Sequence, residues 1–189
     1  MTRHPAPELA WIARLRRLNA GVAVAAGAML LLCAGFVLLD VVLRGLDLHS
    51  FGGTEEVAGY AMALGTAWGM AYALLELAHV RIDLLRARGG PTARAVLDVG
   101  CMVVVSATVT FVAAKAWPVL ERSVVNGSRA NTPLETPLAW VQGPWFAGWV
   151  WFAVMSCLLT LLALSLVVRG RMAEAESAVG AFAERDAAR

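Results

Sequence analysis

The sequence predicts an all-α integral membrane protein with four transmembrane helices and short amphipathic interfacial helices. Four apolar runs with few charges lie at about 18–43, 54–77, 95–117 and 145–168. Each reaches the length of about 20 residues that a helix needs to cross roughly 30 Å of hydrocarbon. Hydrophobic residues make up 59% of the 189 residues, and the mean hydropathy of +0.67 exceeds that of ordinary soluble domains. We therefore expect one membrane domain over residues 1–170 and a cytoplasmic tail over 171–189.

The first run is interpreted as a retained span. Its apolar stretch is longer than that of a signal peptide, and no small-residue cleavage motif follows it before Asp40. The segment before it, about 7–17, alternates apolar and basic residues at helical spacing, with Ile12 and Leu15 set against Arg14 and Arg17. This pattern predicts an amphipathic helix on the cytoplasmic surface, with a plain charged flank as the alternative.

The second run opens with Thr54, Glu55 and Glu56. Thr54 is placed to cap the helix, and carboxylates in a first turn complement the helix dipole. In a compatible interpretation, one glutamate pairs with Arg44 across the short preceding loop, or with a partner protein. Small residues recur inside this run at four-residue spacing, a pattern that favours close helix packing. They are Gly59, Ala63, Ala67 and Ala71. Past the run, we expect residues 78–88 to continue the helix outward with a polar face.

The connection between the third and fourth runs is expected to be irregular. Prolines at positions 133, 137 and 144 forbid a continuous helix over residues 126–144. The fourth helix is therefore expected to begin at about residue 145, after the last of these prolines.

Arginine placement predicts the orientation of the chain. Arginines gather before the first run, between the second and third runs, and after the fourth, whereas the other connections hold few. The positive-inside rule then places both termini in the cytoplasm. Residues 44–54 and 118–144 face outward, which in a bacterial inner membrane is the periplasmic side.

The charges within the apolar runs lie near the ends of the runs, and Asp40 and Asp98 are the deepest. A carrier or pump needs ionisable groups deep in the membrane, so this placement favours an accessory subunit. The histidines, His4, His49 and His79, lie at or beyond the run ends, which argues against haem. No nucleotide-binding loop, activated nucleophile or zinc-ligand spacing is found, so we predict neither an enzyme nor a cofactor. The net charge of +2 gives no indication of nucleic-acid binding.

Three ordered stretches resemble the small membrane subunit of tripartite ATP-independent periplasmic (TRAP) transporters, the DctQ-like family. Arg44 closes the first run, and Thr-Glu-Glu at 54–56 opens the second, like the family's Arg and Thr-Glu-Glu pattern. Residues 78–83 read Ala-His-Val-Arg-Ile-Asp, like the family's Ala-His-(Val/Ile)-Arg-(Val/Ile)-Asp signature. Residues 131–138 resemble its Thr-Pro-x-Leu-x-x-Pro segment, although Glu135 and Thr136 replace the more usual small or apolar pair.

This resemblance implies an accessory, non-conducting subunit of a sodium-driven importer of organic acids. A large DctM-like membrane subunit would carry substrate and sodium ions, and a soluble DctP-like periplasmic protein would deliver the substrate. A phospholipid could occupy the space between the membrane subunits. The residues expected at interfaces or in structural roles are Arg44, Thr54, Glu55, Glu56, His79, Arg81, Asp83, Pro133 and Pro137. We expect Arg81 and Asp83 to fix the helix that leaves the second run on the cytoplasmic side.

Two other functions remain open from the residues alone. A stand-alone four-helix carrier would need a membrane-embedded carboxylate, for which Asp40 is the nearest candidate. A membrane anchor or assembly subunit of another complex would share the same topology.

Overall fold

The computed structural model describes residues 7–48, 50–78 and 90–179, which form five helices. The helices are α1 (Pro7–Gly45), α2 (Thr54–Leu75), α3 (Pro91–Val125), α4 (Leu138–Val168) and α5 (Met172–Val179). By length and composition, α1, α3 and α4 can each cross a membrane. The second expected span forms α2, but α2 is not among these three, so the count of four spans stays a prediction.

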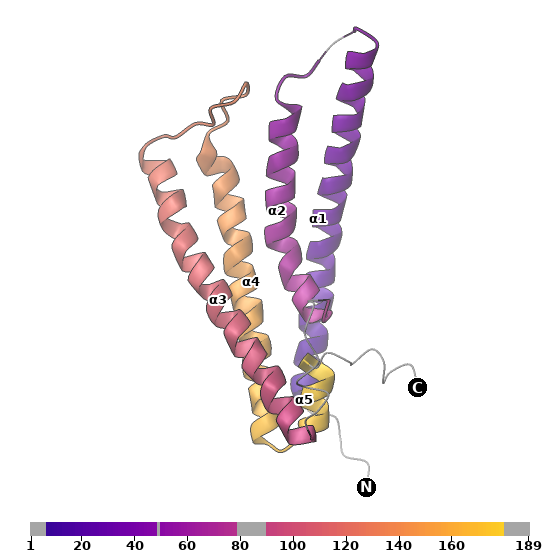
Figure 1. The fold of residues 1–189 in the computed structure, drawn as a ribbon, viewed down its shortest axis with the longest axis vertical. Coiled ribbons are helices and arrows are strands. Elements are labelled where there is room, and N and C mark those ends of the chain that lie inside the picture. The colour runs from indigo at the N-terminus through magenta and orange to yellow at the C-terminus, as the bar shows by residue number, and fades with distance from the viewer. Residues whose placement is uncertain (1–6, 49, 79–89, 180–189) are drawn as a thin grey trace.

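The four long helices lie side by side in the order α1, α2, α4, α3 (Figure 1). The α1–α2 and α3–α4 connections lie together at one end of this row, which we call the loop end. The short helix α5 lies at the opposite end, which we call the α5 end. The α1–α2 hairpin and the α3–α4 hairpin converge toward the α5 end and diverge toward the loop end (Figure 1).

The seam between the two hairpins runs along α2 and α4 and is built from small residues. Ala67 and Ala71 of α2 are buried, and a Cβ atom on Gly148 of α4 would lie only 2.8 Å from the Cβ of Ala67. Small residues allow this close approach of two helix backbones. The predicted small-residue face is therefore confirmed at Ala67 and Ala71, whereas Gly59 is exposed and contacts no neighbouring helix.

Each long helix ends in a Schellman motif, in which a left-handed residue reverses the chain. In α4, Gly170 has φ 70° and the N–H of Arg171 donates to the carbonyl of Leu166 at 2.9 Å. In α2 the left-handed position is Leu77, with φ 57°, a conformation that costs a non-glycine residue about 1 kcal/mol or more. Helix α2 therefore ends at Leu75 and not at 77, and Ala78 is no longer helical. The rest of the predicted 78–88 extension lies outside the described residues.

Two helices continue through prolines that the sequence analysis treated as boundaries. Helix α3 extends beyond the expected 117 and contains Pro118, and α4 begins at Leu138 and contains Pro144. The expectation that Pro144 precedes the fourth helix is therefore wrong. A proline removes one backbone hydrogen bond, and membrane helices tolerate this loss where neighbouring groups compensate. Both prolines also lie within about two turns of a helix end.

The segment 7–17 forms the first turns of α1, without a break before the apolar run. Most of its large apolar residues face the protein: Ile12 is buried, and Leu9 and Leu15 pack against the core, whereas Trp11 is exposed. A separate amphipathic helix lying on the membrane surface is thus not confirmed, because the apolar face of this segment is covered by other helices.

Residues that follow the fourth run pack into the body of the protein. Helix α5 contacts α3, α4 and the start of α1 (Figure 1), and it buries Ala175, Ala178 and Val179 almost completely. These residues join Ile12 of α1 and Leu166 of α4 in one apolar core. Helix α5 therefore fills the narrow end of the row between the two hairpins.

Candidate functional site

At the loop end, Asp40 of α1 holds the α1–α2 connection in place. Its side chain is buried, with Oδ1 accepting a 2.6 Å hydrogen bond from the backbone N–H of Phe51. The other oxygen, Oδ2, pairs with the guanidinium of Arg44 one turn later in the same helix. The Arg44 side chain nevertheless remains 60% exposed. Asp40 therefore ties the loop to the end of α1 and leaves a cationic surface beside it.

The start of α2 differs from the expectation for Thr54. The cap position is Gly53, with φ 90°, and no side chain caps the helix. The Thr54 hydroxyl donates instead to the carbonyl of Phe51 at 2.8 Å, so the prediction that Thr54 is the cap is wrong. Glycine is required at this position because side-chain-bearing residues rarely adopt a φ of 90°.

The α3–α4 loop lies against this turn. A Cβ on Gly53 would lie 2.4 Å from Cγ of Leu134, so the Leu134 side chain packs directly on the glycine backbone. The loop is folded on itself, because the N–H of Ala130 donates to the carbonyl of Thr136 at 2.9 Å. Pro137 then stands at the cap of α4. Two stretches that carry the resemblance, about 80 residues apart in sequence, thus meet at one corner.

Glu56 lies beneath this loop. Its Oε1 accepts a 2.5 Å hydrogen bond from the hydroxyl of Tyr60, and the hydroxyls of Thr132 and Thr136 face its carboxylate. The second oxygen, Oε2, is buried without a hydrogen-bond partner. Donors from both α2 and the α3–α4 loop nevertheless surround the Glu56 carboxylate.

A cavity of about 500 Å³ separates the two connections at this corner. The predicted site residues that line it are Arg44, Thr54, Glu55, Glu56 and Pro133. The expected pairing of Arg44 with a glutamate is not observed, because the Arg44 guanidinium binds Asp40. The cavity therefore presents charges of both signs at the loop end.

His79, Arg81 and Asp83 lie outside the described residues. Within the described ranges, no group of three or more His, Cys, Asp or Glu residues is placed to hold a metal ion.

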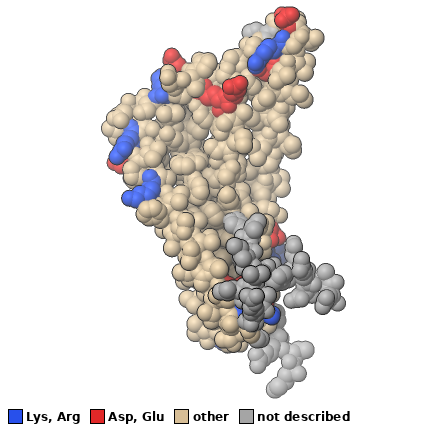
Figure 2. Space-filling model, in the orientation of Figure 1, with Lys and Arg blue, Asp and Glu red and all other residues tan. Residues whose placement is uncertain are grey.

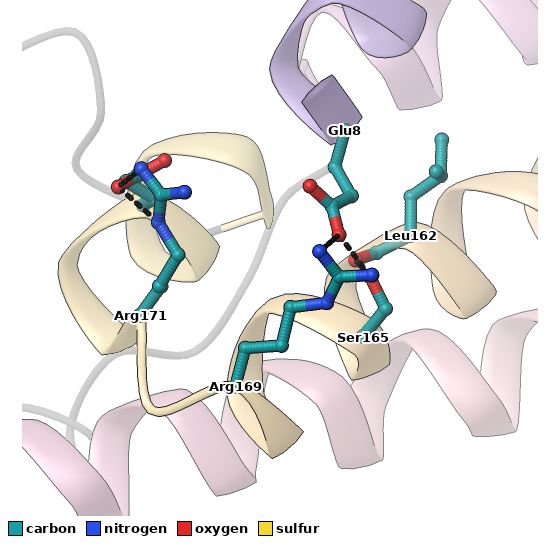
Figure 3. A network of polar contacts seen from close by, with 6 residues as sticks. Glu8, Leu162, Ser165, Arg169 and Arg171 are labelled. Atoms are coloured by element: carbon teal, nitrogen blue, oxygen red, sulfur yellow. Dashed lines mark hydrogen bonds and ion pairs between the residues drawn. The ribbon is translucent and has the colours of Figure 1, made fainter. Parts of the chain in front are cut away.

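A second polar cluster, at the α5 end, was missed by the sequence analysis. Glu8 of α1 is buried, and its Oε1 accepts a 2.9 Å hydrogen bond from Ser165 and pairs with Arg169 at 3.2 Å (Figure 3). Glu8 precedes Ile12 by four residues, so it lies on the buried face of α1. The four-residue spacing between Glu8 and Ile12 could have indicated, from the sequence, that Glu8 is buried.

Charged side chains gather toward the two ends of the molecule, as one face shows in Figure 2. The surface between them is mostly tan, which marks residues other than Lys, Arg, Asp and Glu.

A protein-family model described as "Tripartite ATP-independent periplasmic transporters, DctQ component" matches residues 33–171, which is more than half of the chain. This range includes all three stretches that carry the resemblance. Comparisons with curated proteins and with solved structures gave no match.

Proposed function

The chain belongs to the DctQ family of tripartite ATP-independent periplasmic transporter components, and from this premise we propose that it is the accessory, non-conducting subunit of a sodium-driven importer of organic acids. In this proposal a large DctM-like subunit carries substrate and sodium, and a soluble DctP-like protein delivers the substrate. This chain binds no cofactor and stabilises the fixed part of the large subunit.

The observation that carries the proposal is the absence of charge from the middle of the helix row. No charged residue lies between Arg17 and Asp40 in α1 or between Glu56 and Glu76, and α4 contains none. Moving sodium and an organic anion through a membrane requires polar or ionisable groups at that depth. The charge-free middle therefore supports a scaffold role and not a conducting role.

Polar groups at membrane depth bond within the protein. Ser106 of α3 and Thr160 of α4 are buried and lie 2.7 Å apart, and the Trp151 indole donates to Asn19 at 2.9 Å. These groups join neighbouring helices instead of facing a pathway. A row of helices one layer thick also encloses no passage by itself, and it offers a broad apolar side to a larger membrane partner.

The proposed topology has four spans with both termini in the cytoplasm. With 22 residues, α2 is roughly 33 Å long, enough to cross the hydrocarbon core. It also lies between α1 and α4, which are apolar enough to span a membrane. Arginine placement then assigns the α5 end to the cytoplasm and the loop end to the periplasm of a bacterial inner membrane.

We place the docking surface for the DctP-like protein at the loop-end cavity. Glu55 and the Arg44 side chain are exposed there, and the Glu56 carboxylate retains an oxygen without a partner. Replacing Glu55 and Glu56 by Gln should reduce binding-protein-dependent uptake without changing the yield of assembled complex. Glu121→Gln, at an exposed position of α3, is the matched control. Normal uptake by the double variant excludes this docking surface.

The accessory role is tested by co-expression with a large DctM-like membrane subunit. A tagged chain should elute in detergent as a stable one-to-one complex, and neither subunit alone should transport. Transport by this chain alone in vesicles, abolished by Asp40→Asn, indicates the stand-alone carrier instead. The structure weighs against that outcome, because the Asp40 carboxylate is already bound to Phe51 and Arg44 at a helix end.

The proposed structural role of Arg81 is tested in the same preparation. Arg81→Ala should lower the yield of the complex and leave substrate affinity unchanged, because the sequence predicts this residue in a cytoplasmic connection, away from the proposed docking surface. A normal yield of complex contradicts that role.

A further inference from the structure

The first turns of α1 present two different faces. Ile12 and Leu15 face the core of the protein, as described above, and no described residue covers the opposite side of the helix. Arg14 and Arg17 lie on that side, Trp11 lies at its edge, and all three are exposed. The three residues are spaced by one turn each, so their side chains form one strip along α1.

The charges of this strip are not neutralised within the described part of the chain. Arg169 pairs with Glu8, and Arg171 pairs with Glu174 at 2.5 Å. Arg14 instead lies over the ring of Trp11, 5.1 Å from its centroid, which leaves its positive charge in place. No described carboxylate pairs with Arg14 or Arg17. The strip therefore carries two net positive charges beside an aromatic side chain.

A hydrogen bond sets the depth of this strip. Nε of Arg16 donates to the carbonyl of Leu75, the last residue of α2, at 3.0 Å. This contact places the Arg16 guanidinium beside the end of α2. At 1.5 Å per residue, Trp11 lies roughly 7.5 Å further out and Arg14 roughly 3 Å further out. If the end of α2 marks the edge of the hydrocarbon core, as in the proposed topology, the strip lies in the headgroup layer, which is about 5–7 Å thick.

We propose that Trp11, Arg14 and Arg17 bind the headgroup of an anionic phospholipid in the cytoplasmic leaflet. Guanidinium groups bind phosphate with paired hydrogen bonds, and tryptophan favours the headgroup level. Anionic lipids are attracted by basic residues at this level of a membrane. The assignment of the leaflet rests on the orientation given in the proposed function.

The test compares lipid binding by purified full-length variants. Arg14 and Arg17 are both replaced by Gln, and the control replaces Arg122 and Arg129 at the loop end by Gln, which is the same change in charge. The proteins are exchanged into neutral detergent with phosphatidylglycerol or phosphatidylcholine, and bound lipid is counted by native mass spectrometry. Wild type and control should retain at least threefold more phosphatidylglycerol than the Arg14→Gln/Arg17→Gln variant. Phosphatidylcholine retention should be equal in all three.

Equal retention of phosphatidylglycerol by the double variant and wild type overturns the proposal, as does equal retention of both lipids by wild type. A second variant, Arg14→Lys/Arg17→Lys, keeps the charge and should retain most of the phosphatidylglycerol. If it binds as little lipid as the glutamine variant, recognition of negative charge is excluded. Release of phosphatidylglycerol when the large subunit binds shows that protein covers this strip, which also contradicts the proposal. Because the lipid measurement uses this chain alone, its failure leaves the accessory role untouched.

Discussion

The two ends of the helix row are held together by different interactions. At the α5 end, Ala175 and Val179 are fully buried, and the Glu8–Arg169 pair joins α1 to the end of α4. At the loop end, the contacts are few and mostly polar. Asp40 binds the backbone of Phe51, and the side chain of Leu134 packs on a glycine.

This difference assigns different tasks to the two ends. Apolar burial spread over several helices gives a rigid junction, because many contacts must be lost before it opens. The loop end depends on a few contacts and keeps a cavity lined by charged groups. The α5 end is thus suited to hold the hairpins together, and the loop end is suited to recognise a partner.

The largest expected effect tests the junction at the α5 end. Ala178→Glu places a carboxylate where the native side chain is 2% exposed, and the cost should exceed roughly 3 kcal/mol. Thermal unfolding in detergent measures the loss. Ala173→Glu, at an exposed position of the same helix, should change stability little. Equal stability of the two variants would show that α5 is not packed as described.

The next test concerns the seam between the two ends. Gly148→Val would bring side-chain atoms to within 2.8 Å of Ala67, so α2 and α4 must separate, at a cost of about 1–3 kcal/mol. Gly100→Val, at an exposed position of α3 with no neighbour within 4 Å, is the matched control. A similar thermal midpoint for both variants contradicts the close approach of α2 and α4.

A smaller and more local effect is expected at the loop end. Gly53→Ala meets both a φ of 90° and the Leu134 side chain, and should cost about 1–2 kcal/mol. Gly52→Ala has open space and should be nearly neutral. The Gly53→Ala/Leu134→Ala double variant should recover part of the loss, because it removes the clash and keeps the strained φ. Absence of any recovery indicates that backbone strain alone causes the effect.

The smallest effect should come from the polar contact in the middle of the row. Ser106→Ala removes its hydrogen bond with Thr160 and should cost about 0.6 kcal/mol, a typical value between membrane helices. Thr108→Val removes only an exposed hydrogen bond to the carbonyl of Val104 in the same helix, and should cost less. The free energy of unfolding of each variant, compared with that of the wild type, shows whether this contact contributes less than those at the two ends. A loss larger than that of Gly53→Ala contradicts this order.

The sequence predicted both loop-end connections on one side of the membrane but not that they meet. The stretches around Thr54 and Pro133 are short and ordered, and the structure brings both to one cavity. The contacts within the corner did not follow from the sequence either, because they depend on backbone geometry. The φ of 90° at Gly53 makes this glycine the cap of α2. Because a glycine can adopt many backbone conformations, the sequence does not reveal which one it takes.

The α5 end was less predictable for a different reason. The pattern around Ile12 shows that one face of the helix is apolar, but lipid and protein cover an apolar face equally well. The cover is α5, whose buried side chains are mostly alanines and give a weak signal in the sequence. Likewise, α4 tolerates Pro144 because the proline lies within two turns of the start of the helix. The sequence did not reveal that the helix starts at Leu138, so it did not reveal this either.

The contact between the start of α1 and the end of α4 has a consequence for biosynthesis. Glu8 and Ser165 are separated by 157 residues, and Ile12 shares a core with Val179. A ribosome adds roughly 5–20 residues per second, so the first turns of α1 wait about ten seconds or longer for the residues that cover them. During that interval Glu8, which is buried in the folded protein, and its apolar neighbours are exposed at the membrane surface. Chaperones or early lipid contacts would have most influence on the nascent chain in this period, before its last helix is made.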